Sequence, residues 1–205
     1  MSKSKIAFVD LEGVLIPELW PFLADKFLIP ELRVTTREEA DYPKLMRQRL
    51  ELLRNNKITA KQVRSALREV KPFDKAVRFI ELLRETAYVV MVTDSFSGMN
   101  NYFVDMFATD EVYTNTLIED IEGYFSHCEY WHSGEGKQRI FSCFNTTQKT
   151  LAVGDGLNDI KMLDRADFGI LFQPSETTRR VAPDLPVALE LADVLQFFSC
   201  ELTVH

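Results

Sequence analysis

The sequence predicts an α/β fold with a doubly wound, mainly parallel, Rossmann-like sheet and a small helical segment inserted after the first strand. Short apolar runs at residues 6–9, 87–92, 150–153 and 168–172 are typical of buried strands, and stretches with helical spacing separate them. Such strand–helix alternation implies parallel strands joined by right-handed crossovers. With 205 residues, 46% of them hydrophobic, the chain suits one domain with a sizeable insertion.

The first predicted strand ends in an acidic pair. Residues 6–9 are apolar, and Asp10, Glu12 and Gly13 come next. Because Asp is disfavoured inside strands, Asp10 is expected at the carboxyl end of this strand. Ligands bind at that edge of parallel α/β sheets, so the two carboxylates can supply a nucleophile, a metal ligand or a proton donor. The alternative is an ordinary strand that ends in a solvated acidic turn.

Residues 16–71 are predicted to be helical and to form an inserted cap, which leaves residues 1–15 and 72–205 as the core. Apolar residues recur there at helical spacing, as in the series Tyr42, Leu45, Met46, Leu50 and Leu53. Residues that suit the first turn or the N-cap of three helices are Pro17, Thr36 and Thr59.

The second half of the chain continues the alternation. A helix is predicted from Pro72 to Leu83, and Asp94 or Ser95 is expected to cap the helix that follows the second strand. Residues 112–130 alternate like strands and are predicted to form a small antiparallel excursion. The remaining predicted elements are short helices at 137–144 and around 160–163, a loop or short helix from Pro174, and a final helix at 189–198.

Composition narrows the classes of function. The formal net charge of -7 and the pI of about 5.1 argue against a nucleic-acid-binding surface, which would be basic. No apolar run approaches the ~20 residues of a membrane-spanning helix, and the polar start does not resemble a signal peptide. Three cysteines, Cys128, Cys143 and Cys200, are expected to be reduced thiols. We expect a cytoplasmic protein without nucleic-acid or membrane partners; the sequence does not distinguish a monomer from a homodimer.

Polar residues that end separate strands are expected to meet. Asp10 and Glu12 follow the first strand. Thr93 follows the second strand, and Asp155 and Asp159 follow the third. Parallel strands end at one edge of a sheet, so these side chains converge although they are far apart in the chain. The carboxylates of Asp10, Asp155 and Asp159 are hard oxygen ligands, which suit Mg²⁺ rather than zinc.

These groups match the transfer of a phosphoryl group. Mg²⁺ and Lys137 would neutralise the charge of the phosphoryl oxygens, and Thr93 with backbone N–H groups would hold them. Asp10 is the candidate nucleophile, which would attack phosphorus to form an aspartyl-phosphate. Glu12 would protonate the leaving alkoxide and later deprotonate water. Further candidates for binding the substrate are Asp94 and Asn158.

The motifs resemble those of the haloacid-dehalogenase-like phosphatases. Residues 10–14 read DLEGV, which is similar to that family's DxDx(T/V) opening, and Thr93 resembles its second motif. Lys137 lies 18 residues before Asp155, as the third-motif lysine does, and residues 154–159 resemble the GDGxND motif. The helical insertion resembles the family's C1 cap. Within the family the chain looks closest to phosphoserine phosphatases, in particular to the phosphoserine phosphatase/homoserine phosphotransferase branch, which also carries DLEGV.

The resemblance implies roles for these residues. Asp10, Asp155 and the backbone carbonyl of Glu12 would bind Mg²⁺, and Asp159 would support the metal site. Arg49 resembles the arginine that holds the substrate carboxylate, for which a bidentate guanidinium is apt. Glu18 resembles the acid that meets the substrate amine, although it lies one residue closer to the nucleophile than usual. The implied function is a Mg²⁺-dependent phosphatase or phosphotransferase of serine biosynthesis, which acts on phosphoserine and can transfer phosphate to homoserine.

Alternatives stay open at this point. Glu12 replaces the usual Asp, and a displacement of about 1 Å is costly in catalysis, so hydrolysis can be slower or transfer to an alcohol can compete better. The substrate can be another small phosphorylated metabolite. A phospho-accepting receiver domain also combines acidic residues, a hydroxyl and a lysine around Mg²⁺, but in another order and without a cap. A non-catalytic binding protein is the third possibility. The group His127, Cys128 and His132 lacks the matching second pair of a zinc site.

Overall fold

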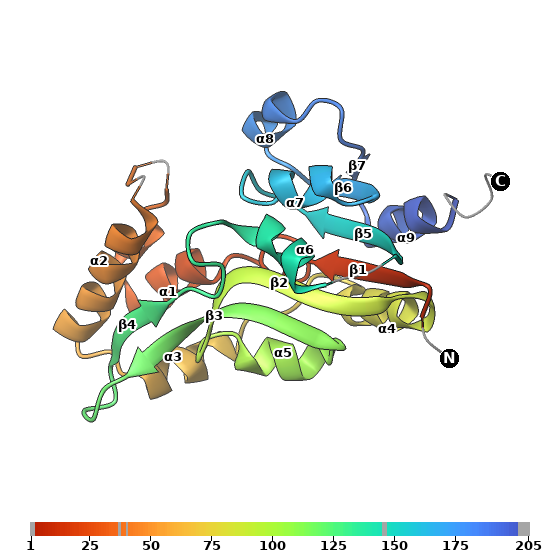
Figure 1. Ribbon diagram of the computed structural model, residues 1–205. Helices are drawn as coiled ribbons and strands as arrows, with labels where there is room; N and C mark the ends of the chain where they lie inside the picture. The colour runs from red at the N-terminus through yellow and green to blue at the C-terminus, as the bar shows by residue number, and fades with distance from the viewer. Residues whose placement is uncertain (1–2, 37, 40, 145–146, 201–205) are drawn as a thin grey trace.

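The computed structural model describes residues 3–36, 38–39, 41–144 and 147–200, with the backbone alone for 199 and 200. Within these residues, seven strands form one sheet in the order β4-β3-β2-β1-β5-β6-β7 (Figure 1). Neighbouring strands are parallel except for the β3–β4 pair. The predicted doubly wound, mainly parallel sheet is therefore confirmed. The strands are β1 (Lys5–Val9), β2 (Tyr88–Ser97), β3 (Glu111–Glu119), β4 (Phe125–Glu129), β5 (Lys149–Gly154), β6 (Phe168–Phe172) and β7 (Val187–Ala188).

Helices cover both faces of the sheet. Successive side chains of a strand point to opposite faces, so Ala7 and Val9 of β1 join a buried cluster with α4, α5 and α9. Ile6 and Phe8 join a second cluster with α6 and α7 on the other face. Because both faces of the central strands are buried, these strands contain continuous apolar runs such as 6–9 and 151–153, which made them visible in the sequence. The helices are α4 (Ala76–Thr86), α5 (Asn101–Phe107), α6 (Ile140–Cys143), α7 (Ile160–Arg165), α8 (Glu176–Val181) and α9 (Leu191–Cys200), with a short 3-10 helix η2 (Lys137–Arg139) before α6.

Between β1 and α4 the chain forms further helices, which lie together at one end of the molecule beside β4 (Figure 1). The tip of the β3–β4 hairpin packs against them. The N–H of Ala60 donates to the carbonyl of Gly123 over 2.9 Å, and Arg54 pairs with Asp120 and, over 2.9 Å, with Glu122. The hairpin thus braces the inserted helices from the side. These helices are α1 (Leu19–Phe27), η1 (Pro30–Arg33), α2 (Tyr42–Asn55) and α3 (Ala60–Leu67).

Several helix starts differ from the prediction. α2 begins after Asp41, whose carboxylate accepts the N–H of Lys44 over 2.9 Å, so Thr36 is not its N-cap. The charged Asp41 side chain caps the helix at the point where the apolar spacing begins. Pro17 and Pro72 lie outside α1 and α4, which begin two and four residues later. Both prolines precede the helix and do not form part of its first turn.

The prediction for the end of the second strand was wrong. β2 runs on to Ser97, so Asp94 and Ser95 lie within it, and Asn100 takes the N-cap position of α5. A register shift after Val92 lets β2 resume its pairing with β3. β3 is therefore a parallel strand of the main sheet, and within residues 112–130 only its pairing with β4 is antiparallel.

Two expectations concern the whole chain. Among the described side chains, Cys128 and Cys143 are free thiols, and the side chain of Cys200 lies outside the described residues. No helix in the described parts of the chain combines the length and the apolar character needed to cross a bilayer.

Candidate active site

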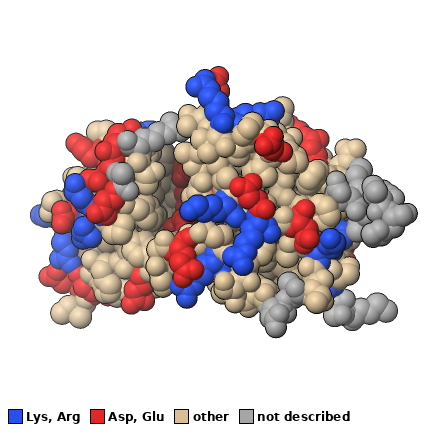
Figure 2. Space-filling view, turned by 45° about the horizontal axis from the view of Figure 1, so that its top comes forward, with Lys and Arg blue, Asp and Glu red and all other residues tan. Residues whose placement is uncertain are grey.

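A cavity of about 780 Å³ lies where the carboxyl ends of the central strands face the inserted helices. Figure 2 shows a cleft on this side of the molecule with acidic side chains visible inside it. Asp159, which is 0% exposed, lies behind the cavity wall. All the other site residues predicted from the sequence line the cavity: Asp10, Glu12, Glu18, Arg49, Thr93, Asp94, Lys137, Asp155 and Asn158.

Three carboxylates gather at the floor of this cavity. Asp10 follows β1, and Asp155 and Asp159 lie on the turn between β5 and α7. Each offers an oxygen atom, and these atoms lie within 4.8 Å of one another. Burial, together with the charges of Asp159 and Glu18, raises the pKa of Asp155 to about 7. Burial is also the main cause that raises the pKa of Asp10 well above its ordinary value, against the attraction of Lys137.

Lys137 places its ammonium group between two of these carboxylates. Its side chain is 1% exposed, and its Nζ lies 2.6 Å from Asp10 Oδ2 and 2.7 Å from Asp159 Oδ1. Burial alone would lower the pKa of Lys137, but the charges of Asp10 and Asp159 outweigh it and raise that pKa well above its ordinary value. Lys137 is therefore a fixed cation. One ammonium opposite three carboxylates leaves the cluster with excess negative charge.

The turn after β5 is shaped around Asp159. Its Oδ2 accepts the backbone N–H groups of Asp155 and Gly156, over 3.1 and 3.0 Å. A Cβ on Gly154 would lie 2.4 Å from the Asp159 carboxyl carbon, so this close approach requires glycine. Asp159 therefore organises the loop that carries Asp155. Asp159 takes the N-cap position of α7 but makes no side-chain capping bond, because its carboxylate binds amides that precede the helix.

Glu12 and Glu18 form an acidic pair on the insertion side of the cavity. Glu12 Oε2 accepts the N–H of Leu19, at the start of α1, over 2.9 Å. Partial loss of hydration inside the cavity, followed by the charge of Glu12 and a hydrogen bond with it, raises the pKa of Glu18 to about 8. The carboxyl of Glu18 therefore holds its proton at neutral pH.

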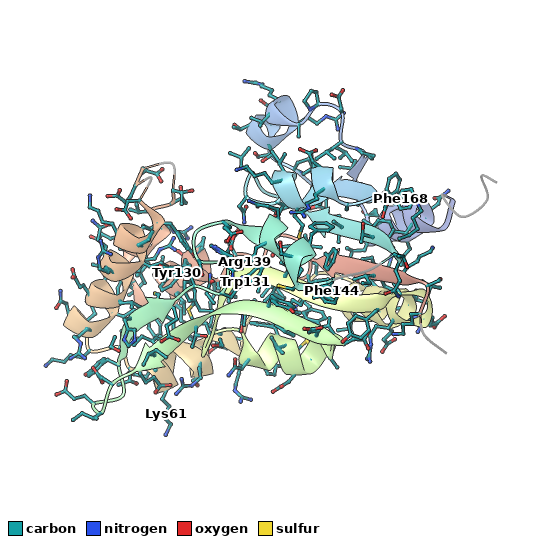
Figure 3. The ribbon with its side chains drawn as sticks, in the orientation of Figure 1. Lys61, Tyr130, Trp131, Arg139, Phe144 and Phe168 are labelled. Atoms are coloured by element: carbon teal, nitrogen blue, oxygen red, sulfur yellow. The ribbon has the colours of Figure 1, made fainter. Side chains whose placement is uncertain are left out.

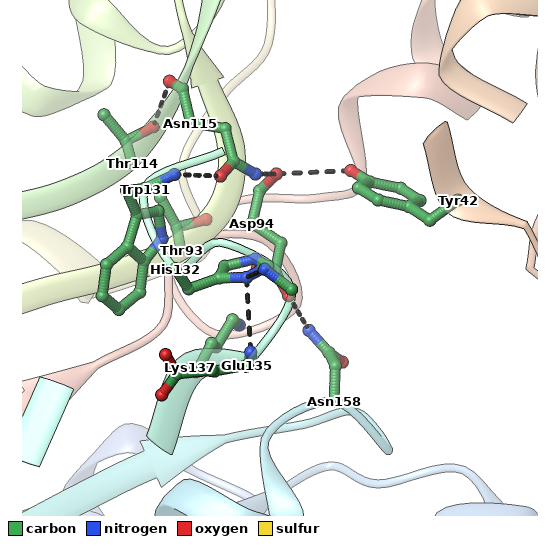
Figure 4. A network of polar contacts seen from close by, with 12 residues as sticks. Tyr42, Thr93, Asp94, Thr114, Asn115, Trp131, His132, Glu135, Lys137 and Asn158 are labelled. Atoms are coloured by element: carbon green, nitrogen blue, oxygen red, sulfur yellow. Dashed lines mark hydrogen bonds and ion pairs between the residues drawn. The ribbon is translucent and has the colours of Figure 1, made fainter. Parts of the chain in front are cut away.

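Thr93 and Asp94 end the straight part of β2. Thr93 is 1% exposed, and its Oγ1 accepts the N–H of Ser95 over 3.1 Å. Asp94 Oδ2 accepts from Asn158 Nδ2 over 2.7 Å, which joins β2 to the turn after β5 (Figure 4). Burial would raise the pKa of Asp94, but Lys137 and the contacts with His132 and Asn158 lower it to about 2. Asp94 is therefore an ionised residue held by its neighbours.

Arg49 projects from α2 to the wall of the same cavity. Arg49 is only 6% exposed. Its Nη2 donates to the carbonyl of Val34 over 2.7 Å, and its guanidinium lies 4.6 Å from the ring centre of Trp20. Within the described structure its Nε has no hydrogen-bond partner. A buried guanidinium with an unused donor suits an anionic group of a ligand.

Sequence reasoning missed several pocket residues. Tyr42 of α2 donates its hydroxyl hydrogen to the carbonyl of Asp94 over 3.3 Å, and Asn115 of β3 donates to the same carbonyl over 2.8 Å (Figure 4). His132 lies 3.2 Å from Asp94 Oδ1. Tyr42 and Asn115 carry no sequence signal, because tertiary packing alone brings them to β2. His132 does carry one, since it and two glycines precede Lys137 closely.

The donor set fits a hard divalent cation. Three carboxylates with excess negative charge and raised pKa values are the environment that such a cation stabilises. Gly13 has a φ of 82°, and a Cβ there would lie 2.3 Å from the Asp155 carboxylate. The loop after β1 thus approaches Asp155 as closely as glycine allows.

Known proteins share this sequence and fold. The haloacid dehalogenase-like hydrolase family matches residues 5–167. The phosphoserine phosphatase of Pseudomonas syringae pv. tomato is 32% identical over 182 residues, which cover 89% of this chain and 77% of that protein. Phosphoserine phosphatase ThrH of Pseudomonas aeruginosa is 30% identical over 194 residues, which cover 95% of each chain.

Solved structures agree with these relatives. A phospho-aspartyl intermediate analogue of phosphoserine phosphatase superposes with a TM-score of 0.77, at 21% identity, over 96% of this chain and 99% of that chain. At this identity the likeness shows the fold alone. Phosphoserine phosphatase from T. onnurineus in complex with NDSB-201 gives a TM-score of 0.71 at 25% identity, over 95% of this chain and 94% of that chain.

Proposed function

Because the chain belongs to the haloacid dehalogenase-like hydrolases and is a phosphatase, we propose that it cleaves a small, amino-acid-like phosphomonoester through an aspartyl-phosphate. Phosphoserine is the first substrate to test, since two relatives at 30% identity or above are named phosphoserine phosphatase. The receiver-like and the non-catalytic alternatives lose their support, because the family match spans residues 5–167, which contain all the motifs of the site.

The observation that carries the proposal is the position of Lys137. Its Nζ bridges Asp10 and Asp159, over 2.6 and 2.7 Å, at the floor of a cavity large enough for a small phosphate ester. A buried ammonium that holds a carboxylate at a strand end suits a nucleophile that receives a phosphoryl group. Asp10 is the proposed nucleophile, because it is the carboxylate at the end of β1 that lines the cavity.

Mg²⁺ is the proposed cofactor. Asp10 and Asp155 would hold it with the backbone carbonyl of Glu12, and Asp159 would support the site through Lys137 and the loop amides. When bound, Mg²⁺ supplies charge neutralisation for the phosphoryl oxygens and orients the ester. Thr93 and Lys137 would hold the same oxygens from the protein side.

The protein groups then carry the bond changes. An Asp10 oxygen attacks phosphorus, the bond from phosphorus to the leaving oxygen breaks, and Glu12 gives that oxygen a proton. In the second half, Glu12 takes a proton from water, whose oxygen attacks the aspartyl-phosphate and releases Asp10 and phosphate. An alcohol such as homoserine in place of water would give a phosphorylated alcohol.

Arg49 and Glu18 are the proposed contacts of the amino-acid part of the substrate. The unused Nε of Arg49 would meet a carboxylate, and Glu18 would meet an ammonium, whose charge offsets the repulsion between Glu18 and Glu12. Asp94 and Asn158 would complete the wall around the phosphate.

We further propose that residues 16–71 form a cap over a core of residues 1–15 and 72–205, and that the enzyme works in the cytoplasm in serine biosynthesis.

A screen tests the proposal. The purified chain is assayed against phosphorylated metabolites, phosphoserine among them, with Mg²⁺ or with EDTA, and with homoserine offered as acceptor. We expect Mg²⁺-dependent phosphate release from phosphoserine that Asp10→Asn abolishes. Turnover of other phosphate esters with none of phosphoserine would replace the proposed substrate. Absence of turnover with the whole panel would overturn the proposed function.

A further inference from the structure

His132 belongs to the cavity wall but has no part in the reaction as proposed. Its side chain is 12% exposed and lies on the segment between β4 and η2, beside Tyr130 and Trp131, which Figure 3 labels. Its Nε2 lies 3.2 Å from Asp94 Oδ1. Its Nδ1 accepts two backbone N–H groups, from Gly134 over 3.2 Å and from Gly136 over 3.3 Å.

These contacts define the form of the imidazole. A ring nitrogen that accepts N–H groups carries no hydrogen, so the neutral ring holds its proton on the other nitrogen. Nδ1 of His132 is the acceptor, so the ring hydrogen lies on Nε2, the nitrogen on the side of Asp94. One ring nitrogen therefore contacts the loop before Lys137, and the other contacts Asp94 on strand β2.

The loop side leads directly to Lys137. Residues 133–136 turn around the imidazole, with φ values of 49° at Ser133, 85° at Gly134 and 82° at Gly136. A positive φ is uncommon for Ser133, whereas glycine adopts it readily at 134 and 136. The two N–H bonds to His132 hold this turn in place. Gly136 precedes Lys137, so the position of the imidazole sets where the Lys137 side chain starts.

The contact of His132 Nε2 restrains the charged Asp94 carboxylate next to the proposed phosphate site. Asp94 follows Thr93 and is ionised, and a free carboxylate there would repel a phosphate group. His132 and Asn158 each contact one carboxylate oxygen of Asp94 and so direct the carboxylate away from the phosphate site. The backbone of Asp94 is fixed separately, because Tyr42 and Asn115 both bind its carbonyl.

We propose that His132 is a positioning residue of this phosphatase, whose neutral imidazole ties the loop before Lys137 to the Asp94 carboxylate. The proposal rests on the proposed function for its kinetic consequences. It predicts two separable effects. The Nδ1 contacts support Lys137 and thus the rate of the chemical step, whereas the Nε2 contact restrains Asp94 and thus the binding of the phosphate.

Two isosteric substitutions separate the two ends of the ring. In His132→Asn the amide oxygen can replace Nδ1 as acceptor, while the contact with Asp94 is lost. In His132→Gln the amide nitrogen can reach toward Asp94, while the acceptor for the loop is lost. With p-nitrophenyl phosphate and Mg²⁺, we expect His132→Gln to lower kcat by about 10- to 100-fold, the usual effect of removing such a support, with KM little changed. We expect His132→Asn to raise KM with kcat nearly unchanged.

Controls distinguish this tie from simple packing. His127 on β4 is an exposed histidine whose Nδ1 contacts Ser126 Oγ over 3.0 Å, and His127→Ala is expected to keep wild-type kinetics. Thermal unfolding of all variants monitors folding. If the two substitutions at His132 change kcat and KM in the same proportion, if neither changes them, or if the split is reversed, the proposal is overturned.

A second measurement needs no substrate and no metal. In protein labelled with ¹³C and ¹⁵N at histidine, the ring signals of His132, identified by their loss in His132→Asn, report the tautomer. We expect the neutral Nε2–H form at neutral pH. A neutral Nδ1–H form, or a ring that is fully protonated at neutral pH, would contradict the proposal. This result decides the matter even if the chain hydrolyses none of the esters tested, an outcome that would count against the proposed function alone.

Discussion

The carboxylate of Glu12 accepts the backbone N–H of Leu19, with 2.9 Å between Oε2 and the amide nitrogen. This bond joins the proposed acid–base residue of the core to the first helix of the insertion. Glu18, at the N-cap position of α1, makes no side-chain capping bond of its own within the described structure. Glu12 therefore caps α1 from a distance, and the extra methylene of Glu over Asp gives it the reach.

Substitution of Glu12 by Asp tests this reach. We expect Glu12→Asp to lose the bond to Leu19 and to destabilise the fold by about 0.5–2 kcal/mol, the usual effect of losing a helix cap. It is also expected to change the ratio of hydrolysis to transfer, since the shorter acid is no longer held by α1. Urea unfolding and product analysis with homoserine as acceptor measure the two effects.

Glu12→Gln is the matched control. The amide oxygen can still accept from Leu19, so the stability is expected to stay near that of the wild type. The side chain can no longer donate and accept the catalytic proton, so kcat is expected to fall by about 10²- to 10⁴-fold. Equal stability of the wild type and Glu12→Asp, with an unchanged ratio of products, would show that the length of this side chain has no consequence.

Gly13 and Gly123 provide a matched pair for the shape of the acidic site. Both have a φ of 82°, but a Cβ at Gly13 would lie 2.3 Å from the Asp155 carboxylate, whereas a Cβ at Gly123 would meet nothing within 4 Å. We expect each Ala substitution to cost about 1–2 kcal/mol of stability from backbone strain. Only Gly13→Ala is expected to lose activity and the response to Mg²⁺. Wild-type activity in Gly13→Ala would contradict the close approach of this loop to Asp155.

The parts of the fold that could be predicted from the sequence are those in which burial requires a run of apolar residues. β1, β5 and β6 are covered on both sides, and each contains an uninterrupted run of buried residues after its first position, so these runs were visible. β7 was missed because it has two residues, Val187 and Ala188. The end of β2 was missed because its last residues, such as Asp94, are polar and resemble a helix cap, while tertiary pairing with β3 keeps them extended.

The candidate site divides in the same way. Asp10, Thr93 and Asp155 could be predicted because each follows a recognisable apolar run and lies within a spaced motif. The partners of Arg49 could not, since its contacts with Val34 and Trp20 arise from the packing of the insertion. His132 was available in the sequence but was considered only as a metal ligand. Its actual contacts are with backbone amides, which no side-chain motif records.

The acidic cluster predicts a pH-dependent stability of the metal-free chain. The pKa of Asp155 rises from an ordinary value of 3.8 to about 7 in the folded chain. Between these values the folded state binds more protons than the unfolded state, so the stability contributed by this group falls as the pH rises through the window. In EDTA we therefore expect Asp155→Asn to be more stable than the wild type above pH 7, with the difference shrinking toward pH 4.

Mg²⁺ should reverse this order. At about 100 times its Kd, the cation is expected to stabilise the wild type by about 2.7 kcal/mol, and to stabilise Asp155→Asn much less. Asp164→Asn, at an exposed position on α7, serves as the control and should behave like the wild type. Thermal unfolding across pH, with and without Mg²⁺, measures both effects. Equal responses of the wild type and Asp155→Asn to Mg²⁺ would rule out Asp155 as a ligand.

Arg49 tests the proposed class of substrate. If its guanidinium binds the substrate carboxylate, Arg49→Ala should raise KM for phosphoserine by about 10- to 100-fold, the usual effect of losing a charged hydrogen bond. KM for p-nitrophenyl phosphate, which has no carboxylate, should change little. Arg47→Ala is the matched control, because Arg47 is exposed on the same helix. An equal loss of activity toward both esters in Arg49→Ala would indicate a structural role for this arginine.

The most direct test of the account is the chemical state of Asp10 during turnover. The enzyme is mixed with Mg²⁺ and an active phosphate ester, quenched in acid after a short time, and digested for peptide mass spectrometry. We predict a phosphate on the peptide that contains Asp10, which hydroxylamine removes and which Asp10→Asn lacks. Turnover without any phosphorylated peptide, a phosphate on another residue, or retained activity of Asp10→Asn would contradict the account.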